Sequence, residues 1–250
     1  MNDIFSRNAL FWGRENQSKL ETFCVAVFGL GGVGGYCAEM LARAGIGSLV
    51  LVDFDRVSSS NINRQITALN STVGKLKTEL FSNRLKDINP NINIETITDF
   101  YTENLSAKVF SKRKIDFTAD AIDTMRSKIS LLEYAYNSGM PVISSMGAGN
   151  RVNPEKLYIS DISEIKNKKA PFVSNILYQL KKRNITKGIP VVASEETPMS
   201  TEKIEETEKI TTSEGEKIEF KKIVPASTPF VASAAGIFTA SYIVRKLLKL

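Results

Sequence analysis

A stretch of seven residues contains five glycines and lies between an apolar stretch and a segment with helical character. The apolar stretch is 25–28, the helical segment is 36–44, and the glycines are Gly29, Gly31, Gly32, Gly34 and Gly35. Glycine allows a tight turn and lets the backbone approach a phosphate without a Cβ atom in the way. A helix that begins there offers free N–H groups and a positive dipole end to an anion. The segment therefore predicts a nucleotide-binding β-α-β unit.

Two acidic residues stand at the end of the next apolar strand, 48–52. Asp53 occupies the position from which a carboxylate accepts hydrogen bonds from a ribose. Asp55 has two interpretations, a contact to the nucleotide or a residue that only ends the strand. Both are candidate binding residues.

The polar residues further along the chain favour ATP over NAD. Asn63 and Arg64 follow the second strand, and Lys77 comes soon afterwards. Arg64 and Lys77 can neutralise phosphate oxygens while an α-phosphoryl group is transferred. Asp123 follows a later apolar strand, where its carboxylate can hold Mg²⁺ beside the phosphates. A dinucleotide oxidoreductase has no need for three charged groups in this order.

Strand and helix patterns alternate along the rest of the chain. The alternation predicts one domain, 1–250, with a doubly wound, mainly parallel α/β sheet of Rossmann type and the ligand at its carboxyl edge. Antiparallel strands are expected within 151–162. The remaining predicted helices are 5–20, 74–88, 104–110, 128–137 and 171–183, and the remaining strands are 92–98, 115–122 and 141–145.

Two segments of the second half need separate interpretations. Residues 194–215 are rich in Glu, Thr and Ser without apolar periodicity, which predicts a mobile acidic loop on the surface or, as the alternative, over the site. Residues 223–244 carry no charge and are long enough to span a bilayer. Pro225 and Pro229 favour instead a short strand followed by a buried helix over about 231–250, and a membrane location is not expected.

Composition excludes several kinds of site. The chain has no histidine, so His-based triads, His general bases and His metal ligands are absent. Its two cysteines, Cys24 and Cys37, indicate a reducing compartment, and without a signal pattern the expected location is cytoplasmic. A net charge of +6 suits a polyanionic partner, although proteins of this charge often bind no nucleic acid.

The chain resembles the ubiquitin-activating-type (E1-like) adenylyltransferases in FGLGGVGGYCAEMLARAGIGSLVLVDFDRVSSSNINRQ, TVGKLKTE and DAIDT. Within that superfamily it is most similar to the tRNA threonylcarbamoyladenosine dehydratases, through GIGSLVLVDFDRV, SSMGAGNRVNPEKLYISDI and FVASAAGIFTASYIVRKLL. No cysteine follows Cys37, where thioester-forming relatives keep a catalytic one. The paired CxxC motifs of zinc-containing relatives are missing too.

The resemblance implies an E1-like adenylation domain that performs ATP-dependent cyclodehydration of N6-threonylcarbamoyladenosine in tRNA through an acyl-adenylate. It implies a homodimer, with a sulfurtransferase partner as an open option. ATP and Mg²⁺ are the expected cofactors. By motif, the phosphate ligands would be Arg64, Lys77 and, across a dimer interface, Arg7; Asp53 would bind the ribose and Asp123 the metal. Lys75 is the rival of Lys77, which fits the family spacing better.

Two other functions stay open. One is an adenylyltransferase for a ubiquitin-like sulfur carrier, and the other is an NAD-binding oxidoreductase or nucleotide sensor. Ser174 and Leu177 stand where the family often has Lys and Arg, so the substrate could have diverged. The candidate tRNA contacts, which an ordinary solvated face would also explain, are Lys166, Lys168, Lys169, Lys181, Lys182, Arg183 and Lys187.

Overall fold

Seven strands form one sheet in the order β3-β2-β1-β4-β5-β7-β6 in the computed structural model, which describes residues 3–111, 114–200, 202 and 204–250. All neighbouring pairs are parallel except β6 and β7. The predicted doubly wound, mainly parallel sheet is therefore confirmed, as is the antiparallel strand in the second half. The strands are β1 Cys24–Phe28, β2 Ser48–Val52, β3 Asn93–Ile97, β4 Phe117–Asp120, β5 Val142–Ser145, β6 Leu157–Asp161 and β7 Pro190–Ser194.

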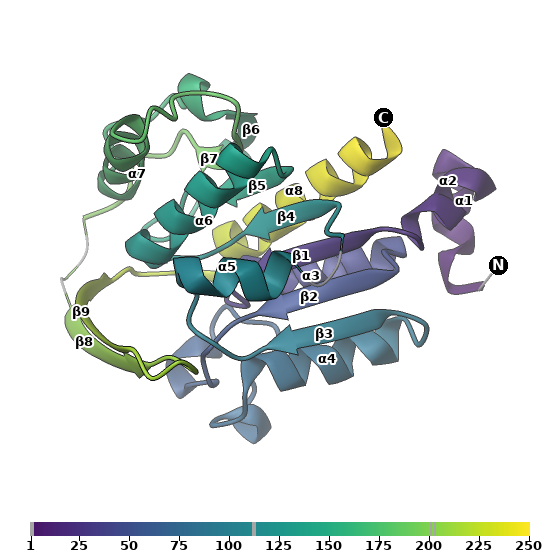
Figure 1. The fold of residues 1–250 in the computed structure, drawn as a ribbon, viewed down its shortest axis with the longest axis horizontal. Coiled ribbons are helices and arrows are strands. Elements are labelled where there is room, and N and C mark those ends of the chain that lie inside the picture. Colours follow the sequence, from purple (N-terminus) through teal and green to yellow (C-terminus); the bar gives the residue numbers. More distant parts are fainter. Residues whose placement is uncertain (1–2, 112–113, 201, 203) are drawn as a thin grey trace.

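Helices cover both faces of this sheet (Figure 1). Val25 and Val27 of β1 pack into a core shared with α3, α4 and α8, whereas Ala26 and Phe28 point into a core shared with α5 and α6. A strand buried on both faces must be apolar throughout, which explains the uninterrupted run in β1. The helices are α3 Gly34–Ala44, α4 Lys77–Ile88, α5 Glu103–Phe110, α6 Met125–Ser138, α7 Pro171–Lys181 and α8 Pro229–Leu248.

The strand order reverses between β1 and β4. The chain runs outward from β1 through β2 to β3, then returns to the other side of β1 and continues through β4 to β5. Connections on either side of such a point leave the sheet toward opposite faces, which opens a crevice at the carboxyl ends of the strands. The glycine turn after β1 and the turn before α6 flank this crevice.

The predicted N-terminal helix is broken into two. Helix α1 spans Ser6–Trp12 and α2 spans Arg14–Leu20, and Gly13 between them has a φ of +85°. A left-handed residue cannot continue a right-handed helix, so the chain turns there. Figure 1 shows α1 and α2 at the end of the molecule opposite β8 and β9.

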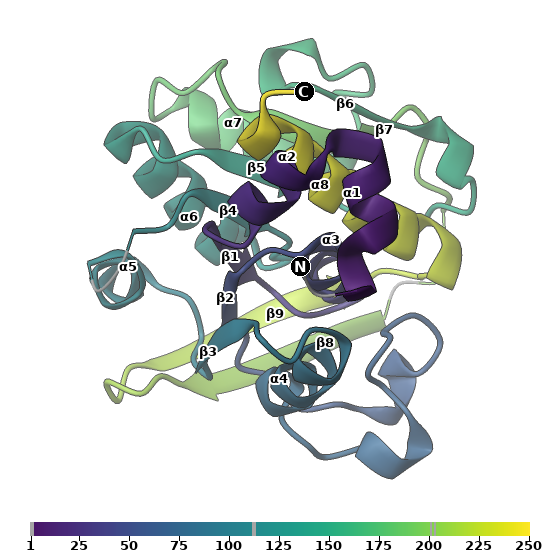
Figure 2. The ribbon, with the colours of Figure 1, turned by 90° about the vertical axis from the view of Figure 1, so that its right-hand side faces the viewer.

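The prediction of a loop over 194–215 is wrong for part of the segment, because Ile204–Thr211 forms strand β8. It pairs with β9, Lys217–Val224, in an antiparallel hairpin that Figure 2 shows crosswise to the sheet. Ile210 faces Ile218 across the pair, and Glu208 faces Phe220. Strand β8 by itself lacks a clear apolar alternation, so its strand character depends on the partner that the fold supplies.

Helix α8 is long and apolar enough to cross a membrane, the one such helix among the described residues. Half of its most apolar window is buried inside the protein. It packs closely on α3, because a Cβ atom at Gly236 would lie 2.3 Å from the carbonyl oxygen of Val33. The prediction of a buried helix in this segment is confirmed.

Candidate nucleotide-binding site

The glycine turn folds back on itself so tightly that it admits no side chain at two positions. A Cβ atom at Gly34 would lie 1.7 Å from the carbonyl oxygen of Gly29. Gly29 has a φ of +84°, and a Cβ atom there would lie 2.8 Å from the carbonyl oxygen of Ala121. Helix α3 begins at Gly34, and Val33 before it makes no side-chain cap. The N-terminus of α3 therefore lies at the crevice, where the positive end of the helix dipole favours an anion, and the N–H of Gly35 donates to the carbonyl of Gly31 at 3.0 Å.

Asp53 holds this turn against the second strand. Its side chain is 7% exposed, its Oδ2 accepts from the N–H of Leu30 at 2.5 Å, and its Oδ1 accepts from the N–H of Asp55 at 2.7 Å. Burial, reinforced by the nearby Asp55 carboxylate, raises the pKa of Asp53 to about 6, against the opposing influence of Lys77. Each carboxylate oxygen can accept a further hydrogen bond, which suits a ribose hydroxyl.

Lys77 is buried beside both acids. Its Nζ lies 2.6 Å from Asp55 Oδ2, and its side chain is 4% exposed against 38% for Asp55. Burial by itself lowers the pKa of Lys77, but Asp53 and Asp55 together raise it above its ordinary value, so the ammonium stays charged. Lys75, the rival for this position, is exposed. The structure therefore brings Lys77 into the site and assigns Asp55 to it as an ion-pair partner.

Arg64 lies against the glycine turn at Gly32. A Cβ atom at Gly32 would lie 3.3 Å from its Cγ. The guanidinium donates to the carbonyl of Ser60 and to Asn63 Oδ1, both at 2.9 Å. Asn63 in turn donates to the carbonyl of Ser227, just before α8. Asn63 thus fixes the loop that carries Arg64 to the start of the last helix.

Asp123 completes a group of three charged residues at the carboxyl edge. Strand β4 ends at Asp120, two residues earlier than predicted, so Asp123 lies in the turn before α6 rather than at a strand end. Its side chain is exposed. Burial lowers the pKa of Arg64 while the charge of Asp123 raises it, and Asp123 also helps to raise the pKa of Lys77. The structure thus gathers Arg64, Lys77 and Asp123.

Asp123 is a suitable ligand for a hard cation. The described residues hold no cluster of three metal-binding side chains. Mg²⁺ in nucleotide sites commonly uses one or two carboxylates and takes its other ligands from phosphates and water. An exposed carboxylate near two cations, Arg64 and Lys77, fits that pattern, so the residues present fit an Mg²⁺ ion shared between Asp123 and a nucleotide.

Arg7 is the one predicted site residue that the structure keeps apart from the others. Its neighbour Asn8 donates to the carbonyl of Arg43, in the last turn of α3, whereas the glycine turn precedes the first turn. The 11 residues of α3 separate the two ends by about 16 Å. Arg7 is also exposed. Within one chain it therefore does not reach the crevice.

The β8–β9 hairpin crosses the carboxyl edge of the sheet. At its base, Ala226 exchanges two hydrogen bonds with Asn150. At its tip, the N–H of Ser213 donates to Asp99 Oδ1 at 3.1 Å, and the Ser213 hydroxyl donates to Asp99 Oδ2. Asn150 follows β5 and Asp99 follows β3, so the hairpin is fastened on both sides of the switch point. Asp99 carries no signal in the sequence, because only the folded hairpin supplies its partner, Ser213.

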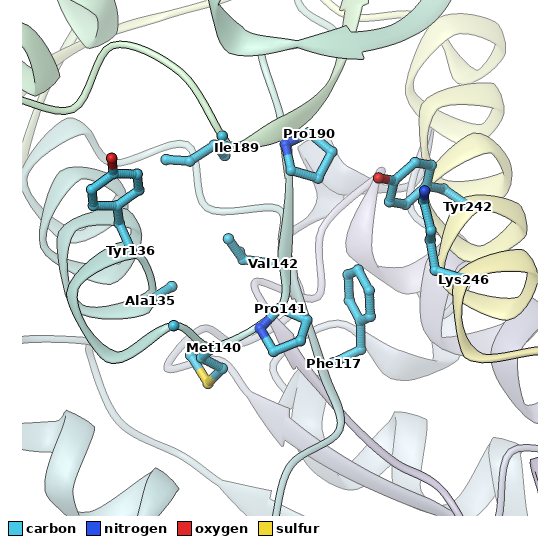
Figure 3. Close-up of a pocket in the computed structure, with 12 residues that line it drawn as sticks. Phe117, Ala135, Tyr136, Met140, Pro141, Val142, Ile189, Pro190, Tyr242 and Lys246 are labelled. Atoms are coloured by element: carbon cyan, nitrogen blue, oxygen red, sulfur yellow. The ribbon is translucent and has the colours of Figure 1, made fainter. Parts of the chain in front are cut away.

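A separate pocket of about 360 Å³ lies at the opposite edge of the sheet (Figure 3). Phe117, Pro141 and Pro190 line it at the amino ends of β4, β5 and β7, and Tyr242 and Lys246 of α8 close one side. Its position and largely apolar lining separate it from the crevice with the charged residues.

Comparison with known proteins decides the family. The family model described as "ThiF family" matches residues 5–244. The chain belongs to the ThiF family. A Bacillus subtilis relative named tRNA threonylcarbamoyladenosine dehydratase is 40% identical over 98% of this chain and 94% of its own length. An Escherichia coli relative of the same name is 34% identical over 64% of this chain and 59% of its own length.

Solved structures agree with this assignment. The Escherichia coli tRNA N6-threonylcarbamoyladenosine dehydratase in complex with AMP superposes with a TM-score of 0.85 at 27% identity, over 99% of this chain and 94% of that one. The same enzyme in complex with ATP gives a TM-score of 0.84 at 26% identity, with the same coverage of both chains. The predicted E1-like fold is confirmed.

Proposed function

We propose that this protein catalyses the ATP-dependent cyclodehydration of N6-threonylcarbamoyladenosine in tRNA, through an acyl-adenylate. The observation that carries the proposal is the convergence of Asp53, Lys77, Arg64 and Asp123 around the glycine turn at the switch point. Near full-length similarity to the Bacillus subtilis dehydratase supports the tRNA substrate. The ATP and AMP complexes of the Escherichia coli enzyme support the nucleotide.

Adenylation begins when a carboxylate oxygen of the threonyl group attacks the α-phosphorus of ATP and pyrophosphate leaves. Arg64, Lys77 and the N–H groups of the glycine turn stabilise the charge that develops on the phosphate oxygens. Asp53 accepts hydrogen bonds from the ribose and fixes the nucleotide along the crevice. Mg²⁺ held by Asp123 would supply Lewis-acid stabilisation of the phosphates.

Ring closure then takes place within the modified nucleoside. A nucleophilic oxygen or nitrogen of the threonylcarbamoyl group attacks the activated carbonyl, and AMP leaves with the former carboxylate oxygen. The net loss from the nucleoside is one water. Nucleophile and electrophile belong to one substrate, which gives them a high effective concentration, so the enzyme needs no covalent nucleophile. A chain without histidine and with one of its two cysteines, Cys37, fully buried suits this route.

A homodimer forms part of the proposal, and Arg7 would act on the partner's nucleotide. Helix α1 exposes Leu10 and Phe11 at 88% and 85%, beside Arg7. Adjacent exposed apolar side chains on one short helix favour a protein–protein contact. A second copy that covers Leu10 and Phe11 would place Arg7 in the interface, next to the partner chain and away from its own crevice. A cytoplasmic location and a sulfurtransferase partner stay predictions.

The tRNA contact would use the basic residues around α7. Lys181, Lys182 and Lys187 are exposed, whereas Lys166 and Arg183 form ion pairs with Glu195 and Glu133. Solvent-exposed cations attract the phosphate backbone over a distance set by ionic strength. Weaker substrate binding at higher salt concentration is expected.

The proposal is tested by incubating the protein with ATP, Mg²⁺ and tRNA that carries N6-threonylcarbamoyladenosine, followed by mass spectrometry of the nucleosides. The wild type should produce a nucleoside lighter by one water, together with AMP and pyrophosphate. The Asp123→Ala variant should fold normally and form neither. Pyrophosphate exchange that depends on a carrier protein, or tight NAD binding without ATP binding, would contradict the proposal and favour the other two functions.

A further inference from the structure

A fully buried polar network lies directly behind the turn that carries Asp123. Lys128 Nζ is 2.5 Å from Asp120 Oδ2 and donates to Ser144 Oγ at 3.1 Å, while the Ser144 hydroxyl donates to Asp120 Oδ2 at 2.6 Å. Asp120, Lys128 and Ser144 are each 0% exposed. They come from β4, α6 and β5, so the network joins three elements at one point.

Stability alone is a weak explanation for this arrangement. Removing two opposite charges from water costs several kcal/mol per ion, and a well-packed apolar group in their place is often equally stable. The fold elsewhere fills such positions with apolar side chains, as at Leu131 and Leu132 of α6 and Ile143 of β5. An ion pair whose two members also hydrogen-bond to a third buried side chain, by contrast, defines one geometry. The network therefore points to a need for defined geometry at this place.

The element whose geometry it defines is the turn 121–123. Asp120 Oδ1 accepts from the N–H of Ile122 at 3.1 Å, which fixes the turn at its start. The N–H of Lys128 donates to the carbonyl of Thr124 at 3.0 Å, which closes the first turn of α6 at the other end. Lys128 thus fixes the end of the turn through its backbone and the start through its side chain.

The same turn touches the nucleotide site. The N–H of Ala121 donates to the carbonyl of Phe28, and the carbonyl of Ala121 lies against Gly29. A displacement of the turn would therefore move both Asp123 and the wall of the glycine turn.

We propose that Asp120, Lys128 and Ser144 are positioning residues, which hold the Asp123 carboxylate where it can bind Mg²⁺ together with the nucleotide phosphates. The inference rests on the proposed role of Asp123 as the metal-binding residue. It assigns the three residues no contact with substrate. Their effect passes through the backbone of the turn.

The test compares ATP affinity with and without Mg²⁺ by calorimetry, a readout that needs no tRNA. In the wild type, Mg²⁺ should tighten ATP binding, and Asp123→Ala should remove that gain. The double variant Asp120→Asn/Lys128→Met removes both buried charges together while Asn keeps an acceptor for Ile122. It should bind ATP without Mg²⁺ within about twofold of the wild type and lose most of the Mg²⁺-dependent gain. Adding Asp123→Ala to it should remove only the small part of the gain that remains.

Controls separate positioning from general destabilisation. Arg84→Met breaks another ion pair of a buried acid, with Glu39 between α3 and α4, and should keep the Mg²⁺-dependent gain. Ser144→Ala, which removes the hydrogen bonds of the Ser144 hydroxyl, replaces the double variant if that variant does not fold. It should lose part of the Mg²⁺-dependent gain in ATP affinity. A full gain in a folded double variant, or additive losses with Asp123→Ala, would overturn the inference. A wild type that shows the gain but dehydrates no tRNA would contradict the proposed function and leave the inference standing.

Discussion

Asp53 has a structural task, and the proposed function gives the same carboxylate a contact to the ribose. Both of its oxygens already accept backbone N–H groups, so it fastens the glycine turn whether or not nucleotide is bound. Burial and the Asp55 carboxylate hold its pKa near 6, within reach of ordinary assay conditions. If Asp53 binds the ribose as proposed, nucleotide affinity depends on pH through this one residue.

ATP affinity should fall as the pH drops through about 6. A protonated Asp53 gives up an acceptor site that the ribose hydroxyls need, so binding should weaken by up to tenfold per pH unit below that value. Calorimetry between pH 7.5 and 5 measures the change. The same titration with Asp53→Asn controls for protonation of ATP itself, and identical slopes in the two proteins would show that Asp53 does not titrate in this range.

The stability of the fold should also depend on Asp53, but it should be higher at low pH, where ATP affinity is lower. The folded protein raises the pKa of Asp53 from 3.8 to about 6, so it binds that proton more tightly than the unfolded chain does. This proton therefore stabilises the folded protein. Its contribution to the free energy of unfolding is fully present below pH 3.8 and is lost as the pH rises through about 6. Relative to Asp53→Asn, the Tm of the wild type should decline between pH 4 and 7, and a constant difference would contradict the assignment.

Two glycines of the turn should respond differently to alanine. Gly34→Ala places Cβ 1.7 Å from the carbonyl oxygen of Gly29, so backbone must move, and we expect a loss of about 3 kcal/mol or more in unfolding free energy. Gly31→Ala places Cβ 3.7 Å from Gln65 Nε2, which is ordinary contact, so the fold should persist while ATP affinity falls. Thermal unfolding and calorimetry on both variants check this, and a stable Gly34→Ala protein would contradict it.

At the scale of the element, the hairpin tip should be held by Asp99. Ser213→Ala removes the hydroxyl that donates to this buried carboxylate, which should release the tip without unfolding the sheet. Hydrogen exchange should then quicken in 204–224 and stay unchanged in β1 and β4. Lys209→Ala, which breaks only the exposed pair with Glu219, serves as the control. Equal exchange in all three proteins would contradict the docking.

The predictability of each element depended on where its stabilising partner lies. β1, β2 and α3 carry their signals locally, in an apolar run, a glycine turn and a helical pattern, and they appear where they were expected. Strand β7 was not predicted, and β8 was predicted as a loop, because neighbours distant in sequence make them strands. The local sequence therefore predicts the secondary structure of the first half of the chain better than that of the second half.

The same rule divides the site residues. Asp53, Arg64, Lys77 and Asp123 follow recognisable patterns, and the structure brings these four together. Nothing in the sequence predicts that Lys128 is buried, because a lysine in a helix ordinarily faces water. Only the folded structure shows its charge buried against Asp120 and Ser144. Arg7 is the opposite case. The family motif predicts it as a site residue, but within its own chain it lies away from the crevice.

For the whole molecule, the proposed dimer predicts complementation. Arg7→Ala and Asp123→Ala should each be inactive alone. Random mixing of equal amounts makes about half of the dimers mixed. If Arg7 acts across the interface, one of the two sites in each mixed dimer is intact, so mixing should restore about a quarter of wild-type activity. Leu10→Glu/Phe11→Glu should give monomers by ultracentrifugation and remove activity. No recovery on mixing, with dimers present, would show that Arg7 does not act in trans.

In the proposed mechanism, the enzyme activates a substrate carboxylate by breaking ATP between its α- and β-phosphates. The most direct measurement uses tRNA whose threonylcarbamoyl carboxylate carries ¹⁸O, incubated with ATP, Mg²⁺ and the wild-type protein. The mechanism predicts that one ¹⁸O appears in the phosphate of AMP for each nucleoside that loses water. Product formed with unlabelled AMP, or with ADP and labelled inorganic phosphate, would contradict it.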